Sequence, residues 1–252
     1  MSMIRLAIMD SFSEQLLSDE GQAFSFVNFA SIGRLFREAG EDPQESLHYF
    51  CDGMLMSNFV SRLTGQSISR VSFDFTSIAP VVFRHAELHR KRVFFLGATP
   101  RELGDFLRKL KARYPQLVVA GREHGYFRRD ETPRVVQTVL DSRCHILIVG
   151  LGAGRQEDFI RQVRRQGFRG VAFSCGAFIR QEAMARDVYY PPLINQLNLR
   201  AFYRMYREPH TILRYLLLYP TNFLRLNYLL ARRRLEINVT PARKKHAHPV
   251  HS

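Results

Sequence analysis

Residues His145 to Ile160 read HILIVGLGAGRQEDFI, an apolar run followed by a glycine-rich turn and a polar segment. No polar residue interrupts Ile146 to Gly150, which predicts a strand buried on both faces. Gly152 and Gly154 allow a tight turn or the close approach of a ligand, and the acids in Gln156 to Asp158 suit the first turn of a helix. In an open parallel sheet, such a turn is the first candidate position for a phosphate-bearing ligand.

The glycine spacing separates this turn from two other nucleotide-binding loops. After Gly150 and Gly152 the next glycine is Gly154, whereas the dinucleotide fingerprint needs one three residues further on and an acid about 20 residues later. A nucleotide-binding oxidoreductase is therefore disfavoured. No Gly-Lys-Ser/Thr triplet occurs, which excludes a Walker A loop. A phosphate site and a plain strand-to-helix connection remain open.

Strand and helix patterns alternate on both sides of this stretch. From about residue 90 to 175 the order is β-α-β-α-β-α-β, which implies parallel pairing with right-handed crossovers. We expect strands at 3–9, 24–29, 47–51, 93–97, 117–120, 146–150 and 170–174, and helices beginning near 11, 30, 54, 76, 100, 131 and 156. The predicted fold class is α/β, a Rossmann-like three-layer α/β/α sandwich with a mostly parallel sheet, over residues 1–198.

The composition is typical of a folded protein that binds polyanions. The 252 residues are 46% hydrophobic and carry 37 basic against 23 acidic side chains, a net charge of +14. This charge favours nucleotide phosphates or an anionic membrane surface as partners. The N-terminus lacks the pattern of a signal peptide, so export is not expected. We expect the cysteines to be buried thiols and three histidines to be core or surface residues rather than metal ligands: Cys51, Cys144, Cys175, His85, His89 and His145.

Basic residues concentrate at the C-terminal end. Residues 200–252 hold eleven Lys or Arg and two Glu, which is +9 of the total +14. Leucine and aromatic residues are interleaved with these charges, but Arg214, Pro220 and Arg225 break the apolar run too often for a spanning helix. We expect residues 199–239 to form a basic amphipathic helical appendage on an anionic membrane, and residues 240–252 to be disordered. A docking helix or a homo-oligomer interface is the alternative, and nucleic acid is disfavoured.

Several blocks of the chain resemble, in the same order, motifs of the WecG/TagA/CpsF glycosyltransferases, family 26. The central GLGAGRQE is similar to the family signature GLGAPKQE. Asp52-Gly53-Met54 resembles DGMG, FFLGATP resembles FFLGGKPG, and GREHGYF resembles GTHDGYF. Asn28 matches the end of the T-x-N strand, RVSFD at 70–74 is similar to ERVTGTD, and RAFYRMYREP is close to LEWLYRLLQEP. The blocks span roughly residues 25–225.

The resemblance implies an inverting, metal-independent transferase that moves a hexose from a UDP-sugar to a polyprenyl-diphosphate-linked acceptor. The implied hexose is of the N-acetylmannosamine type, glucose or a uronic acid, and the implied process is bacterial cell-surface or exopolysaccharide synthesis. The protein would lie in the cytoplasm, peripherally on the inner face of the plasma membrane. No cofactor is implied, and the chain has no Asp-x-Asp to hold a divalent cation.

The family pattern also implies roles for individual residues. Asp52 matches the base that takes the proton from the acceptor hydroxyl, and Asp74 is the alternative base. The other matches are expected to bind the donor or the lipid diphosphate: Asn28, Gly53, Asp74, Gly97, Tyr126, Phe127, Gly152, Gln156, Arg204 and Arg207. A turn-capping role for Asp52 and a solvated helix face for Arg207 are the structural alternatives.

Departures from the family pattern bear on the donor sugar. Phe26 replaces a threonine and His124 replaces an aspartate, while a phenylalanine-aspartate pair becomes Phe178-Ile179-Arg180. Gly154-Arg155 occupies the positions of the family's Pro-Lys, and Arg200 occupies the position of a glutamate. The alternative function is therefore that of a catalytically altered, membrane-associated protein with a binding or assembly role in polysaccharide production.

Overall fold

The computed structural model describes residues 3–18, 20–34, 47–185, 194, 200–209 and 212–242, without the side chains of 200–202, 204 and 214. Residues 35–39, half of the helix expected to begin near residue 30, and all of 243–252 lie outside the described residues. The strands are β1 (Ile4–Met9), β2 (Ala23–Val27), β3 (His48–Cys51), β4 (Arg92–Gly97), β5 (Val118–Glu123), β6 (Ile146–Gly150), β7 (Val171–Ser174) and β8 (Leu235–Thr240). The helices and short helical turns are η1 (Glu14–Leu17), α2 (Met54–Thr64), α3 (Ala79–Leu88), α4 (Pro100–Arg113), η3 (Arg129–Glu131), α5 (Thr132–Asp141), α6 (Arg155–Arg165), α7 (Phe178–Met184), α9 (Arg200–Arg207), η5 (Arg214–Leu218) and α10 (Tyr219–Ala231).

The described strands form one eight-stranded sheet in the order β5-β4-β6-β7-β2-β3-β1-β8. Every neighbouring pair is parallel. The chain leaves β4 for β5 on one side and returns to β6 on the other, so the turns after β4 and β6 diverge at this point. A reversal of strand order of this kind is where open α/β sheets bind ligands.

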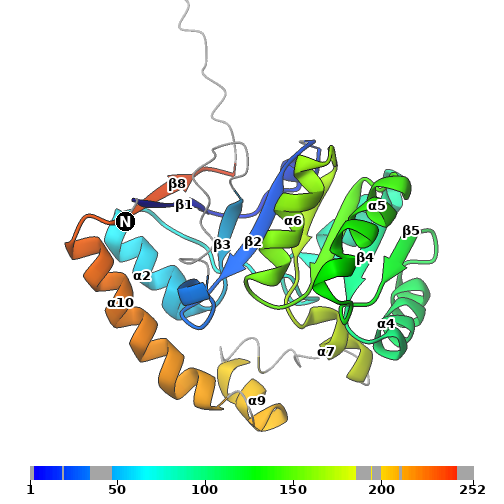
Figure 1. Cartoon of the computed structure of the whole chain (residues 1–252). Helices are drawn as coiled ribbons and strands as arrows, with labels where there is room; N and C mark the ends of the chain where they lie inside the picture. The colour runs from blue at the N-terminus through cyan, green and yellow to red at the C-terminus, as the bar shows by residue number, and fades with distance from the viewer. Residues whose placement is uncertain are drawn as a thin grey trace, which may run out of the picture.

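Helices cover both faces of the sheet because successive strand residues point to opposite sides. In β4, Phe94 and Leu96 belong to the hydrophobic cluster that also holds residues of α2, α5, α6 and α10 on one face of the sheet. Val93 and Phe95 belong to the cluster on the other face, with residues of η1, α3, α4 and α7. All four side chains are almost completely buried. The predicted three-layer α/β/α sandwich is confirmed, and Figure 1 shows the helices on either side of the sheet.

The local sequence accounts for the helix starts near the sheet edge. Thr99 and Glu102 form a reciprocal cap at the start of α4: the Glu102 backbone N–H donates to Thr99 Oγ1 (3.3 Å) and the Thr99 N–H donates to the Glu102 carboxylate (2.9 Å). Gly53 and Gly154, both at φ 93°, precede α2 and α6. These glycines turn the chain sharply after β3 and β6, where a residue with a Cβ would be strained.

The last strand corrects the prediction for the C-terminal segment. Residues 235–239 were expected to belong to a helical appendage and residue 240 to a disordered tail. Instead, β8 pairs in parallel with β1 along its whole length, from Ile4 opposite Leu235 to Met9 opposite Thr240. The alternating apolar residues of LEINVT provide the physical reason, because they suit a half-buried strand. Between α9 and β8 the described residues form η5 and α10, and α10 lies beside α2, with the rings of Phe59 and Phe223 5.7 Å apart (Figure 1).

Candidate active site

A cleft of about 1020 Å³ opens at the carboxyl edge of the sheet. The turns that follow six strands contribute to its lining, with Asn28 after β2, Asp52 after β3, Ala98 after β4, Tyr126 after β5, Gly152 after β6 and Gly176 after β7. Seven of the residues predicted from the sequence line this cleft: Asn28, Asp52, Gly53, Asp74, Tyr126, Gly152 and Gln156. The fold therefore brings together side chains that are up to 128 positions apart in the chain (28 to 156).

Asp52 is held in place by its neighbour on β2. The Asp52 N–H continues the parallel ladder by donating to Val27 O (2.8 Å), and Asn28 Nδ2 donates to the Asp52 carboxylate (3.0 Å). Asn28 Oδ1 accepts from the N–H groups of Ala30 (3.0 Å) and Ser31 (3.1 Å). Because the carbonyl end of the amide is used in this way, the NH₂ end must face Asp52.

The glycine turn after β6 rests on a buried carboxylate. Glu157 is 1% exposed and accepts from the Gly154 N–H (2.6 Å), from Gln156 Nε2 (2.9 Å) and from Ser25 Oγ. Gln156 in turn accepts from the Gly176 N–H (3.2 Å). Gln156 thus joins the turns after β6 and β7, and a role for Glu157 in shaping the turn was not predicted from the sequence.

Arg155 fixes the turn that carries the two predicted aromatic residues. Its guanidinium donates to Gly125 O (3.2 Å) and Phe127 O (2.7 Å) and lies 4.5 Å from the centre of the Phe127 ring. Tyr126 is 71% exposed at the cleft. Phe127 was expected to contact the nucleotide, but it is 5% exposed, packs against Phe159 and does not line the cleft.

Gly97 also lies behind the cleft surface rather than on it. A Cβ at Gly97 would lie 2.7 Å from Gly150 O, so this glycine allows the ends of β4 and β6 to come close together. The position was expected to admit the nucleotide directly; the lining residue there is Ala98, which follows it.

Asp74, the alternative base, is engaged in a local turn. It is 8% exposed, and its carboxylate accepts from Ser72 Oγ (2.7 Å), Thr76 Oγ1 (2.6 Å) and the Thr76 N–H (2.8 Å). The Asp74 backbone carbonyl accepts from the Ala79 N–H at the start of α3. This hydrogen-bond pattern is typical of a carboxylate that orders a turn, and it makes Asp52 the better placed of the two acids.

Arginines that sequence reasoning did not select also line the cleft, among them Arg34 and Arg180. Arg34 is exposed and donates to Ala153 O in the glycine turn (3.4 Å). Arg180 pairs with Glu208 (2.8 Å), whose other oxygen accepts from Gln181 (2.9 Å), so α7 holds the chain that follows α9. The sequence gives the opposite charges of Arg180 and Glu208, but it does not predict that the two side chains are in contact.

Burial excludes the cysteines beside the cleft as nucleophiles. Burial, and then the charge of the neighbouring Asp52, raise the pKa of the Cys51 thiol to about 12. Burial also raises the pKa of Cys175 to about 12. A thiol must ionise to attack, so both remain protonated near neutral pH and behave as the buried hydrophobic residues that the sequence predicted.

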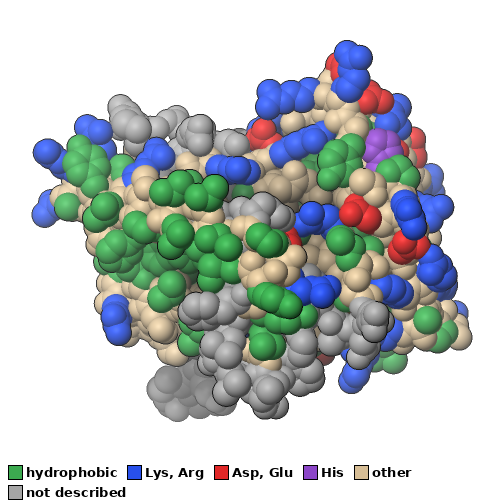
Figure 2. Space-filling model, turned by 90° about the horizontal axis from the view of Figure 1, so that it is seen from below, with side chains coloured by type: hydrophobic (Ala, Val, Ile, Leu, Met, Phe, Trp, Pro, Cys, Tyr) green, Lys and Arg blue, Asp and Glu red, His purple; other side chains and the backbone are tan. Residues whose placement is uncertain are grey.

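An exposed apolar surface adjoins the cleft. Figure 2 shows hydrophobic side chains gathered over the region of α10, with basic side chains around them. We call this the apolar face; its exposed residues are Ile212, Leu213, Leu216, Leu217, Leu218, Phe223, Leu224 and Tyr228. Exposed Met54 and Leu55, on the first turn of α2, line the cleft together with Leu218. None of the helices within the described ranges is both long and apolar enough to cross a membrane.

The two predicted arginines of α9 are not part of the described cleft lining. Arg207 is exposed and lies outside the lining. Arg204 lies on α9, but its side chain is outside the described part of the structure.

The parallel sheet and its covering helices define a Rossmann-like α/β protein, with a cleft at the carboxyl edge where such sheets bind ligands. The chain belongs to the glycosyl transferase WecG/TagA/CpsF family, whose model matches residues 5–236. It is therefore a glycosyltransferase, as the sequence motifs implied.

Relatives with named activities are also similar to the chain. It is 28% identical over 174 residues to the UDP-Gal:alpha-D-GlcNAc-diphosphoundecaprenol beta-1,4-galactosyltransferase of Shigella boydii, covering 69% of the chain and 73% of the relative. It is 31% identical over 154 residues to the N-acetylglucosaminyldiphosphoundecaprenol N-acetyl-beta-D-mannosaminyltransferase of Bacillus spizizenii, covering 60% and 57%. The enzyme of the same name from Bacillus subtilis is 28% identical over 125 residues, covering 49% and 47%.

Proposed function

We propose that the protein transfers a hexose, with inversion and without a metal ion, from a UDP-sugar to a polyprenyl-diphosphate-linked acceptor in bacterial cell-surface or exopolysaccharide synthesis. The observation that carries this proposal is the Asp52 carboxylate, oriented by Asn28 in the same cleft as the Gly152 turn. The names of the relatives, which act on diphosphoundecaprenol-linked GlcNAc, support the lipid-linked acceptor.

Asp52 would act as the general base. Inversion needs one displacement, in which the acceptor hydroxyl oxygen bonds to the anomeric carbon while the bond from that carbon to the diphosphate oxygen breaks. The hydroxyl proton passes to the Asp52 carboxylate, and UDP leaves with the electron pair of the broken bond. The hydrogen bond from Asn28 keeps the carboxylate aimed at the incoming hydroxyl.

The leaving diphosphate requires positive potential, which the cleft supplies from the backbone and from a side chain. Helices α2 and α6 begin at the cleft after Gly53 and Gly154, and a helix N-terminus favours bound anions. The Arg34 guanidinium lies against the glycine turn and is placed to contact a phosphate there. Gln156 and Tyr126 would contact the sugar or nucleotide, and Arg204 and Arg207 would approach from α9.

The apolar face would meet the membrane that holds the lipid-linked acceptor. Its leucines adjoin the cleft lining at Leu218, so a polyprenyl chain in the membrane would bring its diphosphate to the cleft entrance. Basic residues beside exposed leucines suit the interface of an anionic bilayer. We place the protein peripherally on the inner face of the plasma membrane.

The base assignment is tested by Asp52→Asn, which keeps the shape of the side chain but cannot accept the proton. Loss of a general base lowers kcat by about 10²–10⁴-fold, while binding of UDP by calorimetry should remain near that of the parent. Asp74→Asn is the matched control, and it should lower thermal stability more than kcat because Asp74 orders a turn. Equal kcat for Asp52→Asn and the parent would reject the mechanism. A parent that binds UDP-sugars without turnover would instead support the binding or assembly role.

The donor is identified by a thermal-shift panel of UDP-linked galactose, glucose, N-acetylmannosamine and a uronic acid. UDP-galactose belongs in the panel because the Shigella boydii relative is named for it. Phe26 lines the cleft where the family motif has threonine, which removes a hydroxyl from the site and is expected to change sugar preference. A ligand present at a hundred times its Kd stabilises the protein by about 2.7 kcal/mol, enough to rank the donors.

The membrane role is tested with Leu216→Ser/Leu217→Ser, which removes two exposed side chains of the apolar face. Each leucine buried in the interface contributes about 1.5–3 kcal/mol, so binding to anionic vesicles should weaken by at least tenfold. Leu88→Ser, at a leucine that is 73% exposed at the end of α3, is the matched control and should bind as the parent does. Point substitutions are preferable to removal of the whole C-terminal segment, because that would also remove β8 and expose the edge of β1. Equal vesicle binding of the double variant and the parent would contradict the membrane role.

A further inference from the structure

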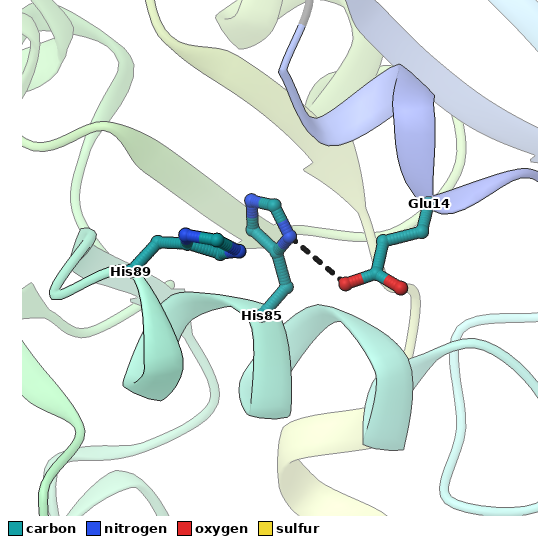
Figure 3. A group of neighbouring side chains, drawn as sticks. All are labelled: Glu14, His85 and His89. Carbon is teal, nitrogen blue, oxygen red and sulfur yellow. Dashed lines mark hydrogen bonds and ion pairs between the residues drawn. The ribbon is translucent and has the colours of Figure 1, made fainter.

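Three side chains with metal-binding atoms meet away from the cleft. His85 and His89 lie on α3 and at its C-cap, four residues apart, and Glu14 comes from η1. One ligand atom of each residue lies within 4.8 Å of those of the other two. Figure 3 shows the His85 ring between His89 and Glu14. We propose that Glu14, His85 and His89 form a binding site for a divalent transition-metal ion such as Zn²⁺.

The spacing and contacts suit metal binding. Two histidines four residues apart lie on one face of a helix and can bind one ion. Their rings are 4.4 Å apart between centroids, and His85 Nδ1 is 3.0 Å from Glu14 Oε1. Tetrahedral ligands at 2.0–2.1 Å from zinc lie roughly 3.3 Å from one another. His85 and Glu14 therefore already have the required separation, and the exposed His89 needs only a small movement.

The surroundings of His85 decide which of its nitrogens would bind the ion. Its side chain is 6% exposed, and within the described residues its Nε2 is buried without a hydrogen-bond partner. Its Nδ1 faces Glu14 Oε1 at 3.0 Å, so Nδ1 is the nitrogen that would bind an ion shared with Glu14, in place of the present hydrogen bond. Two imidazoles with one carboxylate favour zinc-class ions over Mg²⁺ or Ca²⁺, which prefer oxygen ligands.

The proposed site is separate from the transfer reaction. None of its three residues lines the cleft. Asp74, which does, precedes α3, whereas His89 follows its last residue, about 15 Å further along the helix axis. A bound ion would join η1 to α3 and would stabilise the packing of the segment between β1 and β2 against that helix. The proposal therefore stands whether or not the transferase mechanism is correct.

The test uses the full chain without an affinity tag, titrated with Zn²⁺ by calorimetry and with Co²⁺ by visible absorption. We expect one ion per chain at this site and a rise in Tm on the order of 5 °C at a hundredfold excess over Kd. His89→Ala and Glu14→Gln change exposed residues, so both variants should fold. Each should weaken Zn²⁺ binding by at least about tenfold and reduce the Co²⁺ absorption.

The C-terminal residues 240–252 need their own control, because they contain three further histidines that could bind Zn²⁺: His246, His248 and His251. A variant with all three changed to alanine should keep the Zn²⁺ affinity and the Tm rise of the parent. The proposal is overturned if this tail variant loses the binding, or if His89→Ala and Glu14→Gln bind Zn²⁺ as tightly as the parent.

Discussion

The Asn28→Asp substitution tests the arrangement around Asp52 directly. The new carboxylate keeps the oxygen that accepts from the Ala30 and Ser31 N–H groups. Its second oxygen takes the place of Nδ2, 3.0 Å from the Asp52 carboxylate. The donor is thus replaced by a like charge, and the pKa for removing the last proton from this pair of carboxyl groups rises. Asp52 acts as a base only when ionised, so activity should fall at low and neutral pH and recover as pH rises.

The 3.0 Å separation sets the size of this effect. Two unit charges at that distance repel by about 1.4 kcal/mol in bulk water and by about 5.5 kcal/mol at an effective dielectric constant of 20. These energies correspond to about tenfold and about ten-thousandfold in proton affinity. Asp52 is half-buried in an open cleft, between these two environments. We therefore expect the acid limb of the pH–rate profile to move upward by at least about one pH unit.

The assay is kcat/KM as a function of pH, which reports the ionisation of groups in the free enzyme. Gln166→Glu is the matched control, since it adds the same charge on an exposed residue at the far end of α6 from the glycine turn. Its profile should coincide with that of the parent. Asn28→Ala removes the donor without adding charge, so it should lower kcat and move the acid limb upward by less than Asn28→Asp does. A profile for Asn28→Asp that superimposes on the parent's would refute the proposed role of the pair.

Two further predictions concern stability. Gly97→Ala should lower the free energy of unfolding by about 1–3 kcal/mol, because the new Cβ would meet Gly150 O at 2.7 Å; Gly104→Ala in α4, with nothing within 4 Å, should raise it by about 0.4–1 kcal/mol. Urea titrations of both variants measure these changes. A change of the same sign in the free energy of unfolding of both variants would contradict the prediction. Burial, and then the Arg164 guanidinium, lower the pKa of His48 below its usual 6.5. The unfolded chain then binds a proton that the folded chain does not, so stability should fall as pH drops below about 6.5. His48→Gln should flatten that part of the stability curve, and an unchanged slope would show that another group is responsible.

The central strands were predictable because their sequence suits one structure, a strand that is buried on both faces. Ile146 to Gly150 is apolar throughout, and a short run of this kind between a glycine turn and polar residues suits a strand covered on both faces. The alternation of such strands with amphipathic helices then fixes parallel pairing. β8 was missed because a run of arginines precedes it and dominated the expectation of a surface helix, although Leu235, Ile237 and Val239 alternate as in a strand.

The cleft was predictable only in part. Residues at strand ends, such as Asn28, Asp52 and Gly152, were placed correctly in the cleft lining because carboxyl ends of parallel strands share one edge. The position of Phe127 was not, since a sequence does not tell which side of a turn an aromatic ring takes. Arg34 and the Arg180–Glu208 pair depend on contacts between distant segments, which leave no local pattern in the sequence.

The pairing of β1 with β8 has a consequence for how the chain is made. Arg5 and Glu236, paired at 3.3 Å across these two strands, are 231 positions apart. β1 therefore waits until the intervening polypeptide and β8 have left the ribosome before this side of the strand is covered. During that time its unpaired backbone groups form an open edge that can accept a strand from another nascent chain. Expression at low temperature or with slower translation should thus affect the yield of folded protein more than the stability of the protein once it is complete.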